Sequence, residues 1–286
     1  MTPESLVQDT HTLFSLPDVA LRVNELIDHP DTRAIDLAEV ILCDPALAAR
    51  LLRLVNSAYY ALPNQVDTVS QAVYLIGQRE LRDLVMATSA VNLFKGLPPE
   101  QVNMEQFWFH SIACGIAARE LARRCRLPES ERLFLAGLLH GIGKLIFYTQ
   151  CADEYREVLR LIEQEGLDAV AAERRIFGFT YADVSAALLK NWHFPERLWM
   201  AVAHHLEPTG APSYWLEAVI IHAAVYVAGS LQSSTSADSV SSPEITASLA
   251  NMLELEPGSL ASLPAEINLQ VIEVFEIVHP GATLIY

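Results

Sequence analysis

The chain has 286 residues, of which 51% are hydrophobic, so it is long enough to bury a core in one large or two modest domains. Its net charge of -16 opposes binding to nucleic acid or to anionic membranes, and no run of about 18 uncharged apolar residues predicts a membrane span. The first residues lack the basic and apolar regions of a signal peptide, so we expect a cytoplasmic protein.

The predicted elements are helices from one end of the chain to the other, because apolar residues recur at helical spacing and no period-2 alternation is long enough for a sheet. Apolar stripes at Val19–Ile27 and Leu37–Ile41 come first. Asp44 and Pro45 then predict a helix start, with an N-cap acceptor and a proline at the first helical position. Gly77 is expected to end a helix that contains Val69 and Ile76, and a further helix includes Leu81 and Leu93.

Longer helices are expected beyond a break at Gly96-Leu97-Pro98-Pro99. The predicted ranges are 107–125, 133–147, 155–165, 169–177, 181–192, 196–205, 214–231, 243–253 and 259–278. Residues 232–242 are rich in serine and predict a loop. The sequence therefore indicates an all-α fold with an N-terminal helical lobe (1–96), a second helical lobe (97–231), and a Ser-rich loop with C-terminal helices that pack on the second lobe (232–286).

The cysteines and the acidic C-terminal part have plain interpretations. Cys43, Cys114, Cys125 and Cys151 form no CxxC pair and are expected to be reduced, mostly buried thiols. No Lys or Arg follows Arg197, whereas nine acidic residues do, which favours solubility or a docking face for a basic partner. Trp192, Trp199 and Trp215 are expected in the core or between the lobes.

The segment Ala136–Leu145 contains His140-Gly141 and is similar to the motif of the HD superfamily, in which an Asp follows the His and both bind a metal. The similarity extends to the HDOD family, the HD-related output domain of bacterial signalling proteins, and covers roughly Ser15 to Ser230. It is carried by Leu16–Leu21, Asp44–Tyr60, Ser70–Gly77 with Arg79–Arg82, His110, Leu138–Lys144 and His204-His205. The resemblance implies an HD-domain-like helical bundle with an additional N-terminal lobe.

The resemblance also implies which residues stand at the metal positions. The histidines that remain as candidate ligands are His110, His140, His204, His205 and His222. Gly141 replaces the first carboxylate, and the late Asp aligns with Val225, so both acidic ligands are missing. Histidines alone could still hold a divalent transition metal such as Zn²⁺ or Ni²⁺. Adjacent residues such as His204 and His205 point about 100° apart, so at most one of them faces a given point.

Two functions follow from this resemblance. The first is a non-catalytic signal-transduction module that binds a protein or a small ligand, with signalling proteins of two-component or cyclic-nucleotide systems as partners and no cofactor. The alternative is a divergent metal-dependent phosphohydrolase that acts on a nucleotide or cyclic nucleotide. Lys144 and His140 are the candidate ligand-binding residues, because the equivalent Lys of related enzymes contacts substrate phosphate; a solvated Lys144 is the other interpretation.

A weaker third hypothesis is a DNA-binding regulator. Gly77 lies between two predicted helices, with Arg79 and Arg82 at the start of the second, as in a helix-turn-helix. The acidic balance of the chain opposes this hypothesis, and so do Glu80 and Asp83 beside the arginines. The apolar helices and the acidic surface are also compatible with a homodimer.

Overall fold

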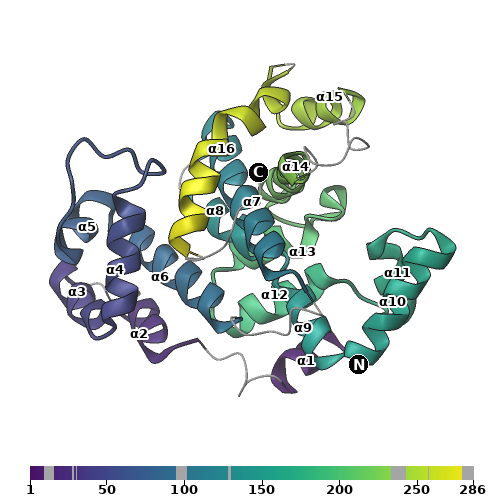
Figure 1. Ribbon diagram of the computed structural model, residues 1–286, viewed down its shortest axis with the longest axis horizontal. Coiled ribbons are helices and arrows are strands. Elements are labelled where there is room, and N and C mark those ends of the chain that lie inside the picture. The colour runs from purple at the N-terminus through teal and green to yellow at the C-terminus, as the bar shows by residue number, and fades with distance from the viewer. Residues whose placement is uncertain are drawn as a thin grey trace.

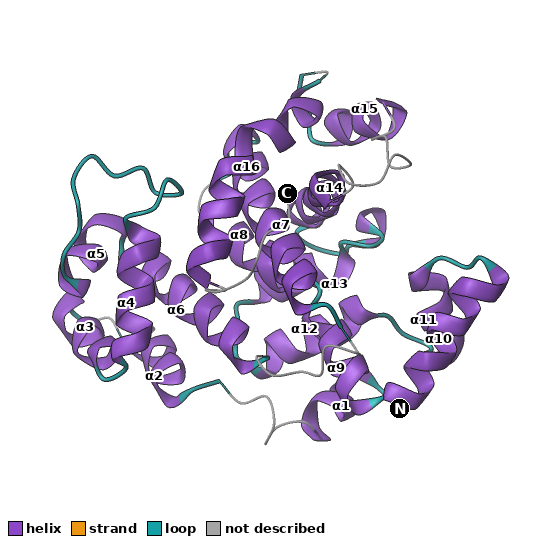
Figure 2. Cartoon of the chain, in the orientation of Figure 1, coloured by secondary structure: helices purple, strands orange, loops and turns teal. Residues whose placement is uncertain are grey.

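The computed structural model describes residues 1–9, 16–27, 29, 31–94, 102–127, 130–232, 243–256 and 258–278. Every regular element in these ranges is a helix, and Figure 2 shows no strand among them. The all-α prediction is therefore confirmed. The expected break at Gly96–Pro99 and residues 233–242 of the Ser-rich segment lie outside the described residues.

We refer to the helices between residues 18 and 93 as the first lobe and to those from residue 104 onward as the second lobe. The first lobe contains α2 (Asp18–Ile27), α3 (Ala34–Leu42), α4 (Pro45–Val55), α5 (Val69–Ile76) and α6 (Gln78–Leu93). Local capping signals start α4 and α5 of this lobe. The α4 helix starts where predicted, because the Asp44 carboxylate accepts hydrogen bonds from the amides of Ala46 and Leu47, each at 3.0 Å. Gly77 joins α5 to α6 at a φ of 91°, a conformation that favours glycine.

The second lobe is built around α7, on which α8 and α14 pack (Figure 1). Its helices are α7 (Met104–Arg124), α8 (Ser130–Leu139), α9 (Ile142–Gln150), α10 (Ala152–Glu165), α11 (Ala169–Phe177), α12 (Tyr181–Asn191), α13 (Glu196–His204), the 3-10 turn η1 (Pro208–Gly210) and α14 (Trp215–Gln232). Two glycines let α7 and α8 cross closely. A Cβ atom on Gly137 would lie 2.8 Å from the carbonyl oxygen of Cys114, and one on Gly115 would lie 2.8 Å from that of Phe134.

The prediction of one continuous helix over residues 133–147 is wrong, because the helix is broken at His140-Gly141. The α8 helix ends at Leu139, and α9 begins at Ile142 with Gly141 as its N-cap residue. Gly143, two residues after Gly141, allows α9 to pack closely on α12: a Cβ atom added to Gly143 would lie 2.2 Å from the carbonyl oxygen of Tyr181 on α12. The first glycine thus marks a helix break, and the second permits contact between two helices.

The two terminal regions pack across the fold in ways that chain order does not suggest. Figure 1 places α1 (Pro3–Asp9) beside α9, and its contacts are with α12 and α9 of the second lobe. The α15 helix (Pro243–Met252) and α16 (Ser259–Val278) close the chain. The α16 helix packs on α7 and α14, and it also contacts α4 of the first lobe. There the Glu273 carboxylate accepts a hydrogen bond from the Ala58 amide at 2.8 Å.

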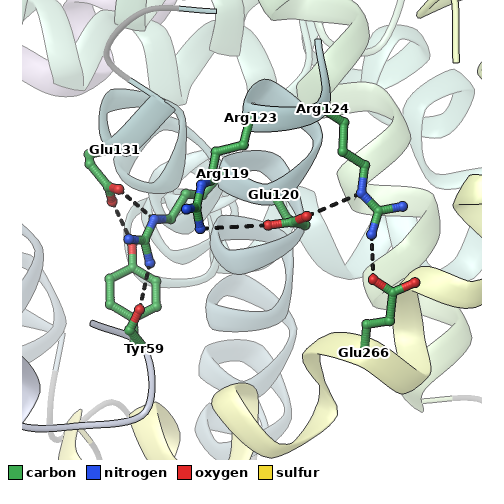
Figure 3. A network of polar contacts seen from close by, with 7 residues as sticks. All are labelled: Tyr59, Arg119, Glu120, Arg123, Arg124, Glu131 and Glu266. Carbon is green, nitrogen blue, oxygen red and sulfur yellow. Dashed lines mark hydrogen bonds and ion pairs between the residues drawn. The ribbon is translucent and has the colours of Figure 1, made fainter. Parts of the chain in front are cut away.

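A network of charged and aromatic side chains joins the lobes (Figure 3). Arg119 of α7 donates from Nε to the Glu131 carboxylate at 2.5 Å and from its guanidinium to the Tyr59 carbonyl oxygen at 2.9 Å. Its guanidinium carbon also lies 3.8 Å from the centroid of the Tyr59 ring, and the Tyr59 hydroxyl donates to Glu131 at 3.0 Å. The turn after α4 is therefore tied to α7 and α8 through one arginine.

The same interface holds a carboxyl group that stays protonated. Glu80 of α6 accepts a hydrogen bond from the Tyr60 hydroxyl at 2.5 Å. Burial, and then the nearby Glu131 carboxylate, raise the pKa of Glu80 to about 9. Since Glu80 is neutral at pH 7, the interface carries one negative charge fewer than its composition suggests.

Several expectations about single residues can be settled. Cys114 and Cys151 are buried, Cys125 is half-buried and Cys43 is exposed, and all four are free thiols. Trp192 is buried and Trp199 is half-buried against the core, whereas Trp215 is 42% exposed at the start of α14, so the expectation that it lies in the core or between the lobes was wrong.

One described stretch, Ser130–Gln150, is long and apolar enough by composition to cross a membrane, but 78% of its most apolar window is buried inside the protein. It spans the break between α8 and α9 and forms part of the core of the second lobe.

Candidate functional site

Three of the five candidate histidines meet in the second lobe. His110 lies on α7, His140 directly follows α8, and His205 directly follows α13. The ring centroids of His110 and His140 are 5.6 Å apart, and those of His140 and His205 are 5.3 Å apart. His140 and His205 are buried, with exposed fractions of 2% and 1%. We refer to His110, His140 and His205 as the histidine cluster.

The other two candidate histidines lie beside the cluster. His204 is half-buried, whereas its neighbour His205 is buried, in keeping with the expectation that only one of them faces the site. His222 of α14 is also half-buried, and its Nδ1 lies 2.7 Å from the backbone carbonyl oxygen of His205. The His222 ring is therefore held against the backbone of His205.

Backbone carbonyl groups fix the tautomer of the buried rings. The Nδ1 atom of His140 lies 2.7 Å from the carbonyl oxygen of Gly137, and that of His205 lies 2.6 Å from the carbonyl oxygen of Val202. Because a carbonyl oxygen can only accept, each Nδ1 must carry the hydrogen. The Nε2 atom of each neutral ring therefore presents a lone pair, which is how metal-binding histidines are commonly oriented.

Tyr181 takes one of these lone pairs. Its hydroxyl lies 3.0 Å from Nε2 of His205, to which it donates a hydrogen bond, and its ring centroid lies 6.4 Å from that of His140. Burial raises the pKa of Tyr181, so the hydroxyl keeps its proton at neutral pH. Nε2 of His205 is therefore hydrogen-bonded to a neutral tyrosine of the same protein.

His140 and His205 carry no positive charge at neutral pH. Burial, followed by the neighbouring His205 and His110 rings, lowers the pKa of His140 well below its ordinary range. Burial likewise lowers the pKa of His205 to about 4. Desolvation penalises the imidazolium form, so both rings are neutral at pH 7.

Lys144 and Glu173 flank Tyr181 on its other sides. The Lys144 ammonium group lies 4.3 Å from the centroid of the Tyr181 ring, and within the described part of the chain it makes no hydrogen bond or ion pair. Burial lowers the pKa of Lys144, while Glu173 acts in the opposite direction. Glu173 is fully buried and accepts hydrogen bonds from the Tyr181 amide at 2.7 Å and from the Tyr155 hydroxyl at 3.0 Å. Lys144 is thus half-buried against a ring and is not a solvated surface lysine.

Neither Tyr181 nor Glu173 was predicted as a site residue from the sequence. Thr180 and Asp183 form a capping box that marks the start of α12, so the position of Tyr181 on the first helical turn was predictable. Its contact with His205 depends on how α12 meets α13 and carries no local signal. Glu173 lies between alanines and arginines on a helix, a context that gives no sign of a buried acid.

The donor set does not fit the metal centre of an HD enzyme. Gly141 and Val225 supply no carboxylate, and Nε2 of His205 is bonded to Tyr181. In the residues that the structure describes, no three His, Cys, Asp or Glu side chains are placed to hold a metal ion. What remains are three histidines, of which His140 and His205 are neutral and hydrogen-bonded, without the hard oxygen ligands that bind such ions and polarise their water.

Comparison with known proteins places the chain in a family. The HDOD domain matches residues 13–208, more than half of the chain, and the protein therefore belongs to the HDOD family. An uncharacterised protein of Treponema pallidum (strain Nichols) is 25% identical over 201 residues, which are 69% of this chain and 38% of that relative. The chain thus spans well under half the length of that relative.

Solved structures share the fold over nearly the whole chain. A candidate phosphohydrolase from Shewanella amazonensis SB2B has a TM-score of 0.77 at 25% identity, with 96% of this chain and 97% of that one covered. An HDOD domain protein of unknown function from Geobacter sulfurreducens has a TM-score of 0.68 at 24% identity, covering 97% of both chains. A candidate signal-transduction protein from Marinobacter aquaeolei VT8 has a TM-score of 0.67 at 23% identity, covering 95% of this chain and 60% of that one. The helical HD-like architecture expected from the sequence is therefore confirmed.

Proposed function

We propose that this HDOD protein is a non-catalytic signalling module that acts by binding another signalling protein. The observation that carries the proposal is the hydrogen bond from Tyr181 to Nε2 of His205, together with the loss of both carboxylates at Gly141 and Val225. A site that has no acidic ligands, and in which one imidazole already accepts a hydrogen bond from a tyrosine, lacks the means to activate water on a metal ion.

Exposed apolar side chains on the first lobe support a role in protein binding. Tyr74 is 86% exposed and Leu75 54% exposed on α5, and Leu42 is 57% exposed on α3, which packs against α5. Exposed apolar groups on neighbouring elements are a common feature of protein–protein contacts. A partner from a two-component or cyclic-nucleotide system would fit the family.

The structure gives little support for DNA binding. Arg82, one of the two arginines in the helix-turn-helix hypothesis, is buried and donates to the Asp83 carboxylate at 2.8 and 2.9 Å. It is therefore not available to a phosphate group. Together with the net charge of -16, this favours a protein partner over a nucleic acid.

The alternative, a metal-dependent phosphohydrolase, draws on two observations. The fold matches that of a candidate phosphohydrolase from Shewanella amazonensis SB2B, and His110, His140 and His205 have stayed together. In that case Lys144, next to Tyr181 and one turn beyond His140, would bind an anionic group of the ligand.

The two functions differ in what purified protein should contain and do. We expect protein purified without chelator to hold less than about 0.1 equivalent of Zn, Ni, Mn or Fe by elemental analysis, since structural zinc sites are normally stoichiometric. We also expect no hydrolysis of bis(p-nitrophenyl) phosphate or of cyclic mononucleotides in the presence of any of these ions. A stoichiometric metal that supports hydrolysis, with both lost in His140→Ala, would establish the phosphohydrolase instead.

A further inference from the structure

Tyr181 is held in place from three directions. Its amide donates to the buried Glu173 carboxylate at 2.7 Å, and its ring lies under the Lys144 ammonium group, 4.3 Å from the ring centroid. Its carbonyl oxygen lies against Gly143, where a Cβ would come within 2.2 Å. These contacts fix both the backbone and the ring of Tyr181, and they therefore direct its hydroxyl toward His205.

The position of Tyr181 bears directly on metal binding. The separations of 5.6 and 5.3 Å between ring centroids in the histidine cluster are close to the roughly 5 Å expected for two imidazoles that bind one tetrahedral ion. The tautomers of His140 and His205 also present Nε2, the atom such an ion would need. The spacing and tautomers of His140 and His205 thus suit two imidazoles on one ion, but no third ligand among the described residues is placed to complete the set, and the Tyr181 hydroxyl occupies Nε2 of His205.

The missing carboxylate at residue 141 has left room behind. A Cβ on Gly141 would meet only the ring of Phe107, at 3.7 and 3.9 Å, which is ordinary van der Waals contact. Its φ of -98° is open to any residue. Nothing in the contacts of this Cβ therefore requires glycine here, so a side chain can begin at this position without a clash.

We propose that the Tyr181 hydroxyl and a divalent metal ion compete for the same ligand atom, Nε2 of His205. The competition, added to the loss of the carboxylate at Gly141, keeps the cluster free of metal. This inference rests on the proposed non-catalytic function and adds to it the residue that blocks the site.

A set of four proteins tests the competition: the unaltered chain, Tyr181→Phe, Gly141→Asp and the double variant. Tyr181→Phe removes the hydroxyl and keeps the ring that packs against Lys144 and the histidines. Co²⁺ is the probe, and its binding is followed by isothermal titration calorimetry and by the visible absorption of the bound ion. We expect the double variant to bind one Co²⁺ about tenfold more tightly than Gly141→Asp, the factor that one hydrogen bond of ordinary strength represents.

A matched control separates the hydroxyl at this position from the loss of any buried phenol. Tyr155 is also buried, and its hydroxyl donates to Glu173 and not to a histidine. Adding Tyr155→Phe to Gly141→Asp should leave Co²⁺ affinity unchanged. A nitrogen-15 spectrum should in addition show the His205 Nε2 signal moving in metal-free Tyr181→Phe, which confirms that the variant is folded and has lost this bond.

The inference is overturned if Tyr181→Phe, folded by that spectrum, fails to tighten Co²⁺ binding in the Gly141→Asp background. It is also overturned if the unaltered chain binds Co²⁺ as tightly as the double variant. Neither result shows phosphodiester hydrolysis, so the proposed non-catalytic function fails only on the separate finding of metal-dependent turnover by the unaltered chain.

Discussion

Replacing Gly143 by alanine is expected to destabilise the protein by about 3 kcal/mol or more, because the added methyl group would enter a backbone contact. Its Cβ would lie 2.2 Å from the Tyr181 carbonyl oxygen and 2.8 Å from the Ser185 amide nitrogen, on a helix that also receives a hydrogen bond from Gly143. Neither backbone atom can move without shifting α12 away from α9. Urea unfolding of Gly143→Ala, followed by circular dichroism, measures the loss.

Gly141→Ala is the matched control, two residues earlier in the same motif. The nearest atoms to its added methyl group are ring carbons of Phe107 at 3.7 and 3.9 Å, and its φ is ordinary for any residue. We expect a change of less than about 1 kcal/mol, the range of an N-cap substitution. Equal losses in the two variants would show that the close approach of α9 to α12 is not real.

Removing Arg119 is expected to cost about 3 kcal/mol, because it leaves the Glu131 carboxylate without its cation in a partly buried interface. The side chains of Arg119 and Glu131 are 12% and 25% exposed, and Glu80 next to them stays protonated. Arg119→Ala also removes the guanidinium from the face of the Tyr59 ring. The first lobe should then separate more easily from α7 and α8, so limited proteolysis near the lobe junction should be faster and the melting temperature lower.

Arg160→Ala provides the comparison, because Arg160 forms an ion pair with Glu157 at the surface. The two side chains are 49% and 44% exposed, so solvent screens the pair and its removal should change the stability of the protein very little. If Arg119→Ala is as mild as Arg160→Ala, the network in Figure 3 does not hold the lobes together.

The sequence was sufficient to predict much of the fold, because its signals are local. Asp44 with Pro45 specified the start of α4, and Gly77 separated α5 from α6, as the structure confirms. The break at His140-Gly141 was missed because the apolar pattern continues through it from α8 into α9. The contact of α16 with α4 was also beyond local reasoning, since it joins residues near opposite ends of the chain.

The candidate site was predictable in its residue types and less so in its chemistry. Resemblance to a family pointed to five histidines, of which the structure brings His110, His140 and His205 together and leaves His204 and His222 beside them. The hydrogen bond between Tyr181 and His205 was not predicted, because it depends on the packing of α12 against α13. Long-range contacts of this kind depend on packing and have no short-range signal in a single sequence.

His140 and His205 are neutral in the folded protein, and the pH dependence of stability follows from the pKa of His205, which burial lowers to about 4 from an ordinary value of 6.5. Because the unfolded chain binds more protons than the folded one between these values, stability should be full above about pH 6.5 and decrease as the pH falls toward 4. The pKa of His140 is also lowered by burial, so its protonation at low pH opposes folding in the same way.

The most direct measurement is a nitrogen-15 NMR titration of the histidine side chains from pH 8 to pH 5, with and without one equivalent of Zn²⁺, with signals assigned through His140→Gln and His205→Gln. Both rings should remain neutral, with the hydrogen on Nδ1, over the whole range and should be unaffected by the ion. A ring of His140 or His205 that titrates near its ordinary pKa, or whose Nε2 signal moves stoichiometrically with Zn²⁺, would contradict the account.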